Sequence, residues 1–154
     1  MFGKIYVMKL ILMRHGQSGG NVGLKGDEFD RLTLRGVKQA EEAGKKIKNR
    51  KIKVIYCSPV GRCVQTLDEI LEVKKKQVPA NLSRLIKPKL KKEKLEELQK
   101  RVILFLEDLK CELEEDEEAL VISHLPVVKM FEYEITGKAD FWENGEIKEF
   151  DYSR

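Results

Sequence analysis

The sequence predicts an α/β protein, a three-layer α/β/α sandwich with a mostly parallel central sheet. Three short apolar runs, at 10–13, 54–57 and 119–122, are continuous rather than alternating, which is typical of strands covered on both faces. Helical patterns lie between them, and strands that alternate with helices favour a parallel sheet. The 154 residues are expected to form a single domain over 1–154, because this length suits one sizeable core.

Two helices are predicted in the first half of the chain. Thr33 is a suitable N-cap for the first, whose inward positions step by three and four: Val37, Ala40, Gly44 and Ile47. Ser58 and Pro59 predict the start of the second, because proline is favoured in the first turn after a capping serine. Its inward face consists of Val60, Cys63, Leu67, Ile70 and Leu71.

The second half of the chain adds two helices and a final strand. The longer helix is predicted from an apolar face that runs from Leu95 to Leu113 over about five turns. The other is expected to begin at Pro126 and to end at Gly137, because glycine adopts the left-handed conformation that ends many helices. Residues 145–152 have the pattern of a strand at the edge of the sheet.

Charge and hydropathy exclude two classes of partner. The formal charge of +4 is a small surplus of 30 basic over 26 acidic side chains, so nucleic acid is not an expected partner. No run approaches the roughly 18 apolar residues that cross a bilayer, and Lys4 and Lys9 interrupt the apolar N-terminus. We therefore expect neither a membrane span nor a signal peptide. Met8 is an alternative to Met1 as the natural start, and the oligomeric state stays open.

Cysteine usage points to a reducing compartment. The three cysteines, Cys57, Cys63 and Cys111, are odd in number and lack the spacing of a disulfide framework. We expect them to be reduced, buried thiols in a cytoplasmic protein.

Chemically distinctive residues follow the three apolar runs. Arg14 and His15 come directly after the first run, Arg62 lies shortly after the second, and His124 follows the third. In a doubly wound sheet, ligands bind beyond the carboxyl ends of the strands. Both histidines of the protein and two arginines are therefore expected to meet at one edge of the sheet.

Two arginines and two histidines are suited to binding a tetrahedral dianion, because guanidinium groups bind phosphate through paired, charge-assisted hydrogen bonds. The expected pocket contains no serine, threonine or cysteine with a base beside it and no GxxxxGK[ST] loop, so a neutral imidazole is the best nucleophile available there. Neighbouring cations disfavour the imidazolium form. We expect His15 to attack phosphorus while His124 and the arginines hold the phosphate oxygens.

A zinc site is the competing interpretation, since the two histidines and either Cys57 or Cys63 supply suitable ligand atoms. Arginines at the same edge would repel a dication, and the chain has no CxxC or HxxxH spacing. We therefore expect no metal and no other cofactor.

Four motifs are spread over the chain between residues 9 and 128. In chain order they are RHGQSxxN (Arg14 to Asn21), LTxxGxxQA (Leu32 to Ala40), SPxxRxxQT (Ser58 to Thr66) and VISH (Val121 to His124). In this order and spacing the chain resembles the histidine phosphatase superfamily, the phosphoglycerate mutase-like proteins. The resemblance implies a sandwich around a mostly parallel sheet and a phosphohistidine intermediate on His15. It also implies two groups of site residues: a phosphate pocket of Arg14, Arg62 and His124, and substrate contacts from Asn21, Ser18 and Gln17.

The sequence departs from the family at the general acid. Many members carry a glutamate in an LxExxxG segment, where this chain has Lys87. The acid phosphatase branch places an aspartate after its second histidine, whereas Leu125 follows His124 here. The short chain, the lack of an evident acid and the SHLP ending resemble the small phosphohistidine phosphatases, which cleave a P–N bond. The RHGQSxxN motif, however, follows the mutase and general phosphatase branch.

Four carboxylates remain as candidates for a general acid: Asp27, Glu28, Asp30 and Glu93, of which we rank Glu28 and Glu93 first. We expect a metal-independent phosphatase that acts on a small phosphorylated substrate or on a phosphohistidine protein. The alternatives are a phosphoglycerate mutase-type phosphotransferase and a catalytically weak module that recognises phosphate. The sequence does not identify the physiological substrate.

Overall fold

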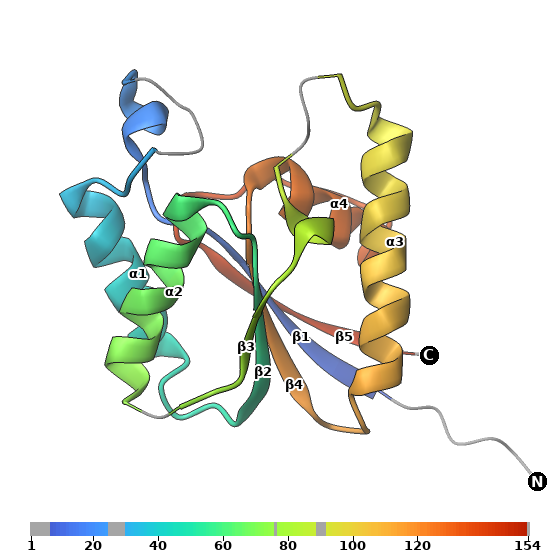
Figure 1. The fold of residues 1–154 in the computed structure, drawn as a ribbon. Coiled ribbons are helices and arrows are strands. Elements are labelled where there is room, and N and C mark those ends of the chain that lie inside the picture. The colour runs from blue at the N-terminus through green and yellow to red at the C-terminus, as the bar shows by residue number, and fades with distance from the viewer. Residues whose placement is uncertain (1–6, 25–29, 76, 89–91, 154) are drawn as a thin grey trace, which may run out of the picture.

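The computed structural model describes residues 7–24, 30–75, 77–88 and 92–153 (Figure 1). They form a five-stranded sheet in the order β3-β2-β4-β1-β5, in which β5 is antiparallel to its neighbour and the other pairs are parallel. The strands are β1 (Val7–Arg14), β2 (Ile52–Cys57), β3 (Ala80–Leu82), β4 (Glu118–Ser123) and β5 (Ile147–Ser153). The predicted α/β class, the mostly parallel sheet and the edge strand near the C-terminus are confirmed.

Two helices cover each face of the sheet (Figure 1). On one face lie α1 (Leu34–Lys46) and α2 (Gly61–Lys74), and on the other α3 (Leu95–Glu112) and α4 (Leu125–Thr136). Within the described ranges, none of the helices combines the length and the apolar character needed to cross a membrane. That residues 1–154 make up a single domain stays a prediction.

The continuous apolar runs are buried on both faces, as predicted. In β1, Ile11 and Met13 pack in a cluster with residues of α1 and α2. Leu10 and Leu12 belong to a second cluster, with residues of α3 and α4. All four side chains are at most 1 % exposed. The sheet therefore separates two hydrophobic cores, which explains why its central strands show no alternation of apolar and polar residues.

Two predicted helix ends are confirmed by their capping geometry. The hydroxyl of Thr33 accepts a hydrogen bond of 3.0 Å from the backbone N–H of Gly36, and α1 begins directly after it. At the other end of the fold, Gly137 has a φ of 82° and closes α4.

Three sequence predictions are wrong in detail. Helix α2 begins at Gly61 rather than at Pro59, with Val60 as its N-cap residue, and the hydroxyl of Ser58 lies 2.8 Å from Nε2 of His124. Leu95 was expected in the core but is 63 % exposed, since it lies in the first turn of α3. Cys111 was expected to be buried and is exposed, although all three cysteines are free thiols as predicted.

The loop after β1 touches the first turn of α1 through backbone atoms. A Cβ added to Gly36 would lie 2.0 Å from the carbonyl oxygen of Gln17, and one added to Gly16 would lie 2.4 Å from the carbonyl oxygen of Gly36. Hydrogen bonds from Thr33 N to Gln17 O (2.9 Å) and from Gln17 N to Gln39 Oε1 (2.8 Å) join the same two segments. The LTxxGxxQA motif thus fastens this loop to α1.

Gly36→Ala is expected to destabilise the protein by roughly 2 kcal/mol or more, because the added methyl group meets backbone that cannot move without shifting the loop. Urea denaturation measures the change. Gly44→Ala is the matched control on the same helix, since its added Cβ meets the side chain of Val73 at 3.1 Å rather than backbone. Equal stability of the Gly36→Ala variant and the native protein would contradict this account of the contact.

Candidate active site

The pairing of β1 with β4 brings the two histidines together. These parallel strands are in register so that Arg14 lies opposite Ser123, and the N–H of His15 donates to the carbonyl of Ser123 at 3.0 Å. Each histidine therefore leaves its strand at the same level, and His124 is also the N-cap residue of α4. The two imidazole rings lie edge to face, with centroids 5.2 Å apart.

A cavity of about 290 Å³ lies at this end of the sheet. Its walls contain six of the residues predicted from the sequence: Arg14, His15, Ser18, Asn21, Arg62 and His124. The remaining wall residues come from four segments. Gly20 lies in the 3₁₀ helix η1 (Gly19–Val22), Asp30 precedes α1, Pro88 precedes α3, and Leu125 and Pro126 begin α4. The cavity is close to the lower end of the size range of small-molecule sites, roughly 300 Å³.

The imidazole of His15 is held in one tautomer. Its Nδ1 lies 2.7 Å from the carbonyl oxygen of Gly16, which can only accept a hydrogen bond, so Nδ1 carries the proton and Nε2 keeps its lone pair. The pKa of His15 is lowered to about 4, mainly by burial; the cations of Arg62 and Arg14 contribute to the lowering, while the Gly16 carbonyl and Asp30 oppose it. His15 is therefore neutral near physiological pH, as a nucleophile requires.

Among the described residues, only one ring nitrogen of His124, Nε2, has hydrogen-bond partners. Its Nε2 lies 2.8 Å from the hydroxyl of Ser58 and 3.4 Å from the thiol of Cys63. Its Nδ1 is buried without a hydrogen-bond partner among the described residues, and so is Nε of Arg14. Burial is the main reason why the pKa of His124 falls to about 2, with further lowering by His15 and the two arginines. Arg14 and His124 both line the cavity, and each has a buried nitrogen whose hydrogen-bonding capacity no described residue uses.

A chain of contacts behind the cavity positions Arg14. Its Nη1 donates to the carbonyl of Trp142 at 2.6 Å, and the indole N–H of Trp142 donates to the carboxylate of Glu132 at 3.2 Å. Lys148 completes the chain with an ion pair of 3.2 Å to Glu132. Burial lowers the pKa of Arg14, but an arginine side chain remains charged at neutral pH. The guanidinium therefore keeps its charge in a fixed orientation.

The three predicted substrate contacts occupy different positions. The hydroxyl of Ser18 donates to Oδ1 of Asn21 at 2.9 Å, and Nδ2 of Asn144 donates to the same oxygen at 3.2 Å. Both Ser18 and Asn21 line the cavity. Gln17 does not, because its Oε1 accepts a hydrogen bond of 2.9 Å from the hydroxyl of Thr33. Its side chain serves the contact with α1 instead.

The two carboxylates ranked first as general acids are Glu28 and Glu93. Glu28 lies outside the described residues. Glu93 is not among the residues that line the cavity, and both of its oxygens accept hydrogen bonds from Arg101, at 2.7 and 2.8 Å. The carboxylate that does line the cavity is Asp30, which is 8 % exposed and accepts bonds of 3.0 Å from the N–H of Gly20.

Sequence reasoning assigned no role to several residues that shape this site: Ser58, Glu132, Trp142 and Asn144. Ser58 was visible in the SPxxRxxQT motif but was interpreted as a helix cap. The other three had no local signal, since Trp142 reaches Arg14 across a separation of 128 residues. Among the described residues there is no cluster of three or more potential metal ligands, and independence from metal stays a prediction.

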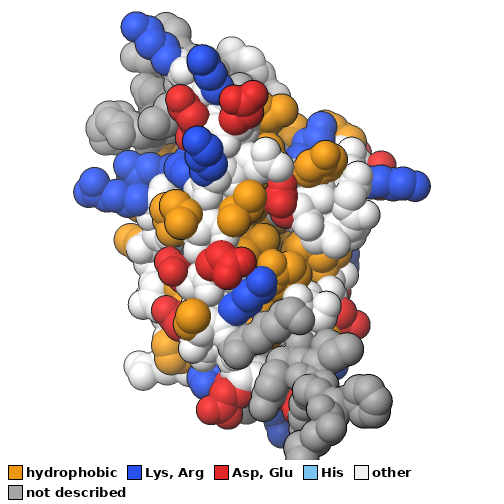
Figure 2. Space-filling model, turned by 90° about the vertical axis from the view of Figure 1, so that its right-hand side faces the viewer, with side chains coloured by type: hydrophobic (Ala, Val, Ile, Leu, Met, Phe, Trp, Pro, Cys, Tyr) orange, Lys and Arg blue, Asp and Glu red, His pale blue; other side chains and the backbone are white. Residues whose placement is uncertain are grey.

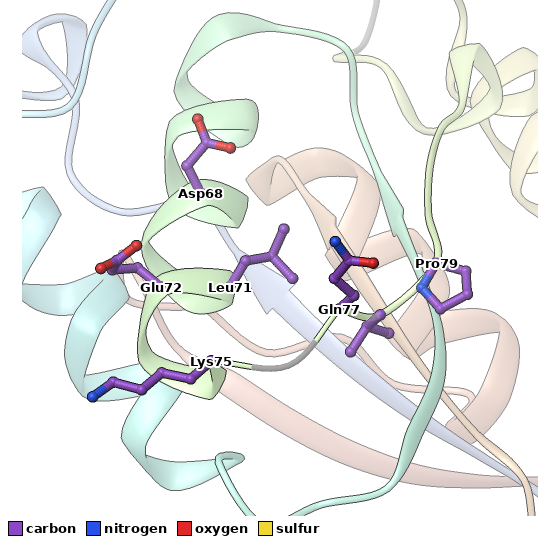
Figure 3. Close-up of a pocket in the computed structure, with 7 residues that line it drawn as sticks. Asp68, Leu71, Glu72, Lys75, Gln77 and Pro79 are labelled. Atoms are coloured by element: carbon purple, nitrogen blue, oxygen red, sulfur yellow. The ribbon is translucent and has the colours of Figure 1, made fainter.

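A larger hollow of about 760 Å³ lies at the far end of α2 from Arg62 (Figure 3). It is lined by Asp68, Leu71, Glu72, Lys75, Gln77, Val78 and Pro79. It contains neither histidine nor arginine and shares no wall residue with the cavity around His15, so it is not a second part of that site.

The sequence model of the histidine phosphatase superfamily (branch 1) matches residues 10–86, which is half of the chain. The chain belongs to this superfamily. Its members are phosphatases or mutases that use a phosphohistidine intermediate. The matched segment includes three of the four motifs and ends before the strand that delivers His124.

Curated and solved proteins similar to this chain include phosphoglycerate mutases. A 2,3-bisphosphoglycerate-dependent phosphoglycerate mutase of Thermoplasma acidophilum is 41 % identical over 71 residues, which are 44 % of this chain and 36 % of that protein. The match therefore spans about a third of that relative's length. The phosphoglycerate mutase of Bacillus anthracis has the same fold, with a TM-score of 0.84, 15 % identity, and coverage of 96 % of this chain and 88 % of that chain.

A phosphatase shares the fold as well. The phosphoserine phosphatase of Entamoeba histolytica, solved in complex with 3-phosphoglyceric acid, has a TM-score of 0.76 and 21 % identity, with coverage of 93 % of this chain and 90 % of that chain. The fold therefore houses both kinds of enzyme, and it carries sites for small phosphorylated compounds.

The buried histidines predict a loss of stability on acidification. A histidine whose pKa is lowered by folding takes up its proton in the unfolded chain first, so the free energy of unfolding falls as the pH drops from about 6.5 to about 4. The share of His15 is on the order of 3 kcal/mol at the lower end of this window. Urea denaturation across the window measures the slope. His15→Asn, which keeps a side-chain N–H, should have a shallower slope, and an unchanged slope would contradict the assignment.

Proposed function

We propose that this chain is a metal-independent phosphatase that hydrolyses a phosphomonoester or a phosphohistidine through a covalent phosphohistidine on His15. The main support is the tautomer of His15: its Nδ1–H is held by the Gly16 carbonyl, which leaves Nε2 as the nucleophile. Further support comes from His124 and Arg14, which line the same cavity and each keep a nitrogen without a partner among the described residues.

The reaction proceeds in two transfers. In the first, the lone pair of His15 Nε2 forms the N–P bond while the bond from phosphorus to the leaving oxygen or nitrogen breaks, and the leaving atom takes a proton. In the second, water attacks phosphorus, the N–P bond breaks, inorganic phosphate leaves and Nε2 regains its lone pair. Arg14, Arg62 and His124 stabilise the charge on the equatorial oxygens in both steps.

Asp30 is the proposed proton donor to the leaving atom, because it is the carboxylate on the cavity wall. Asp30→Asn keeps an oxygen that can accept from the N–H of Gly20 but removes the acid. We expect this variant to hydrolyse alkyl phosphates at least about tenfold more slowly, and p-nitrophenyl phosphate within a few-fold of the native rate, because nitrophenolate leaves without a proton. Steady-state rates on both substrates measure the difference. An equal loss on both would show that Asp30 has only a structural role.

A phosphohistidine substrate relies less on such an acid, because an imidazole leaves more easily than an alkoxide. The proposal therefore includes a phosphohistidine protein as a candidate substrate, in keeping with the resemblance to the small phosphohistidine phosphatases. The proposed setting is the cytoplasm, since all three cysteines are free thiols.

His15→Ala is expected to lower the turnover of p-nitrophenyl phosphate by roughly a thousandfold or more, because it removes the imidazole whose Nε2 lone pair is left free by the hydrogen bond from Nδ1 to Gly16. In the native protein, mixing with a reactive phosphodonor such as phosphoramidate should leave an acid-labile phosphate on His15, detected by mass spectrometry of the intact chain. Circular dichroism of the variant controls for folding. Undiminished turnover by a folded variant would overturn the mechanism.

A mutase-type phosphotransferase is the second candidate, and the matched segment of the Thermoplasma enzyme favours it. An assay with 2- and 3-phosphoglycerate in the presence of 2,3-bisphosphoglycerate separates the two: interconversion faster than release of inorganic phosphate would replace the phosphatase proposal. The third alternative, a module that only recognises phosphate, would bind phosphodonors without forming the phosphate bond on His15.

A further inference from the structure

An apolar groove of about 600 Å³ lies between the first half of α3 and helix α4. Figure 2 shows hydrophobic side chains gathered on the face of the molecule that carries α3. The groove is lined largely by Leu95, Leu98, Met130 and Tyr133. Its volume falls within the range of small-molecule sites, roughly 300 to 1,000 Å³.

Two of these side chains are costly to leave on a surface. Leu95 is 63 % exposed and Tyr133 is 50 % exposed, although each belongs to a helix that packs on the sheet. The apolar pattern of α3 assigned Leu95 to the core, but its side chain contributes to the groove instead. Neighbouring apolar side chains that stay exposed on a small protein indicate a binding surface.

The groove adjoins the cavity around His15. Leu125 and Pro126 line both hollows, and they are the two residues that follow His124 directly. A phosphoryl group seated between the two histidines can therefore extend its leaving group past the first turn of α4 into the groove.

Few polar groups in the groove are available to bind a sugar or a nucleotide. The side-chain amide of Gln99 already donates to Glu134 across the two helices. The charged side chains of the wall are one acid and one base, Glu96 and Lys129, so the groove has no surplus of charge for a second phosphate. An apolar group fits this lining better than a polyhydroxylated one.

We propose that this groove is the leaving-group subsite, and that the substrates are phosphomonoesters of apolar alcohols or phenols. This inference rests on the proposed phosphatase function, in which the phosphoryl group occupies the cavity around His15. Leu95 and Tyr133 then determine specificity through contact with the aryl or alkyl group, while the arginines and histidines bind the phosphoryl group common to all substrates.

Binding of two phosphonates tests the groove without any need for turnover. We expect 1-naphthylmethylphosphonate to bind the native protein about tenfold more tightly than methylphosphonate, measured by calorimetry. The double variant Leu95→Ser/Tyr133→Ser should bind methylphosphonate as the native protein does and lose most of the advantage of the naphthyl compound. No advantage in the native protein, or the same advantage in the double variant, would overturn the proposal.

A matched control separates the groove from a general effect of removing leucine. Leu104 lies on the same helix and is 55 % exposed, but it is not part of the groove. Leu104→Ser should leave both affinities unchanged. If Leu104→Ser weakened binding of the naphthyl compound as much as Leu95→Ser does, the groove would not be a substrate subsite. The same conclusion would follow if light scattering showed that the native protein is a dimer and that Leu95→Ser dissociates it.

Turnover distinguishes failure of the subsite from failure of the function. Leu95→Ser should lower kcat/KM for 1-naphthyl phosphate by about tenfold and change it less than twofold for acetyl phosphate, whose leaving group is too small to reach the groove. If the native protein hydrolysed neither compound, the proposed phosphatase function would be overturned. The phosphonate binding experiment would still test whether the groove binds the apolar group. Equal losses on both substrates would overturn the subsite alone.

Discussion

The parallel pairing of β1 with β4 is the interaction on which the rest of the site depends. Its register sets Arg14 opposite Ser123, so both strands end at the same level and the next residue of each is a histidine. Because the two strands are central in the sheet and buried on both faces, a shift of register would move apolar side chains out of two cores at once. The hydrophobic core thereby specifies the distance between two polar catalytic candidates.

The loop after β1 needs a second constraint, because a strand end alone does not fix the direction of the chain that follows. Backbone contact between Gly16 and Gly36 and the hydrogen bonds of Gln17 with Thr33 and Gln39 supply it. Five residues of the recognised motifs therefore act on the shape of the loop. Gln17 is the clearest case: its place in RHGQSxxN suggested a substrate contact, whereas its side chain faces α1.

Burial then defines the chemistry that the cavity can perform. Buried imidazoles next to two guanidinium groups have lowered pKa values, so positive charge at the site comes from the arginines while His15 keeps a lone pair. A bound phosphoryl group would satisfy the buried nitrogens of Arg14 and His124 that have no partner in the described structure. The groove between α3 and α4 shares Leu125 and Pro126 with the cavity and is lined mainly by apolar side chains. In the proposed complex, the cavity therefore recognises the phosphoryl group and the groove recognises the leaving group.

Local patterns in the sequence determined four of the five strands of the described sheet, the four α-helices, the start of α1 and the end of α4, because these depend on periodicity and capping. They also determined the meeting of Arg14, His15, Arg62 and His124, which depends on the positions of strand ends. The tertiary structure alone decided the roles of carboxylates and of single exposed side chains. Glu93 and Asp30 look alike as acidic residues in loops, but the first pairs with Arg101 and the second reaches the cavity. Leu95 fits the apolar face of α3 and yet lies in a groove, and Trp142 touches Arg14 from 128 residues away. These outcomes depend on how distant segments pack, and no short stretch of sequence records that.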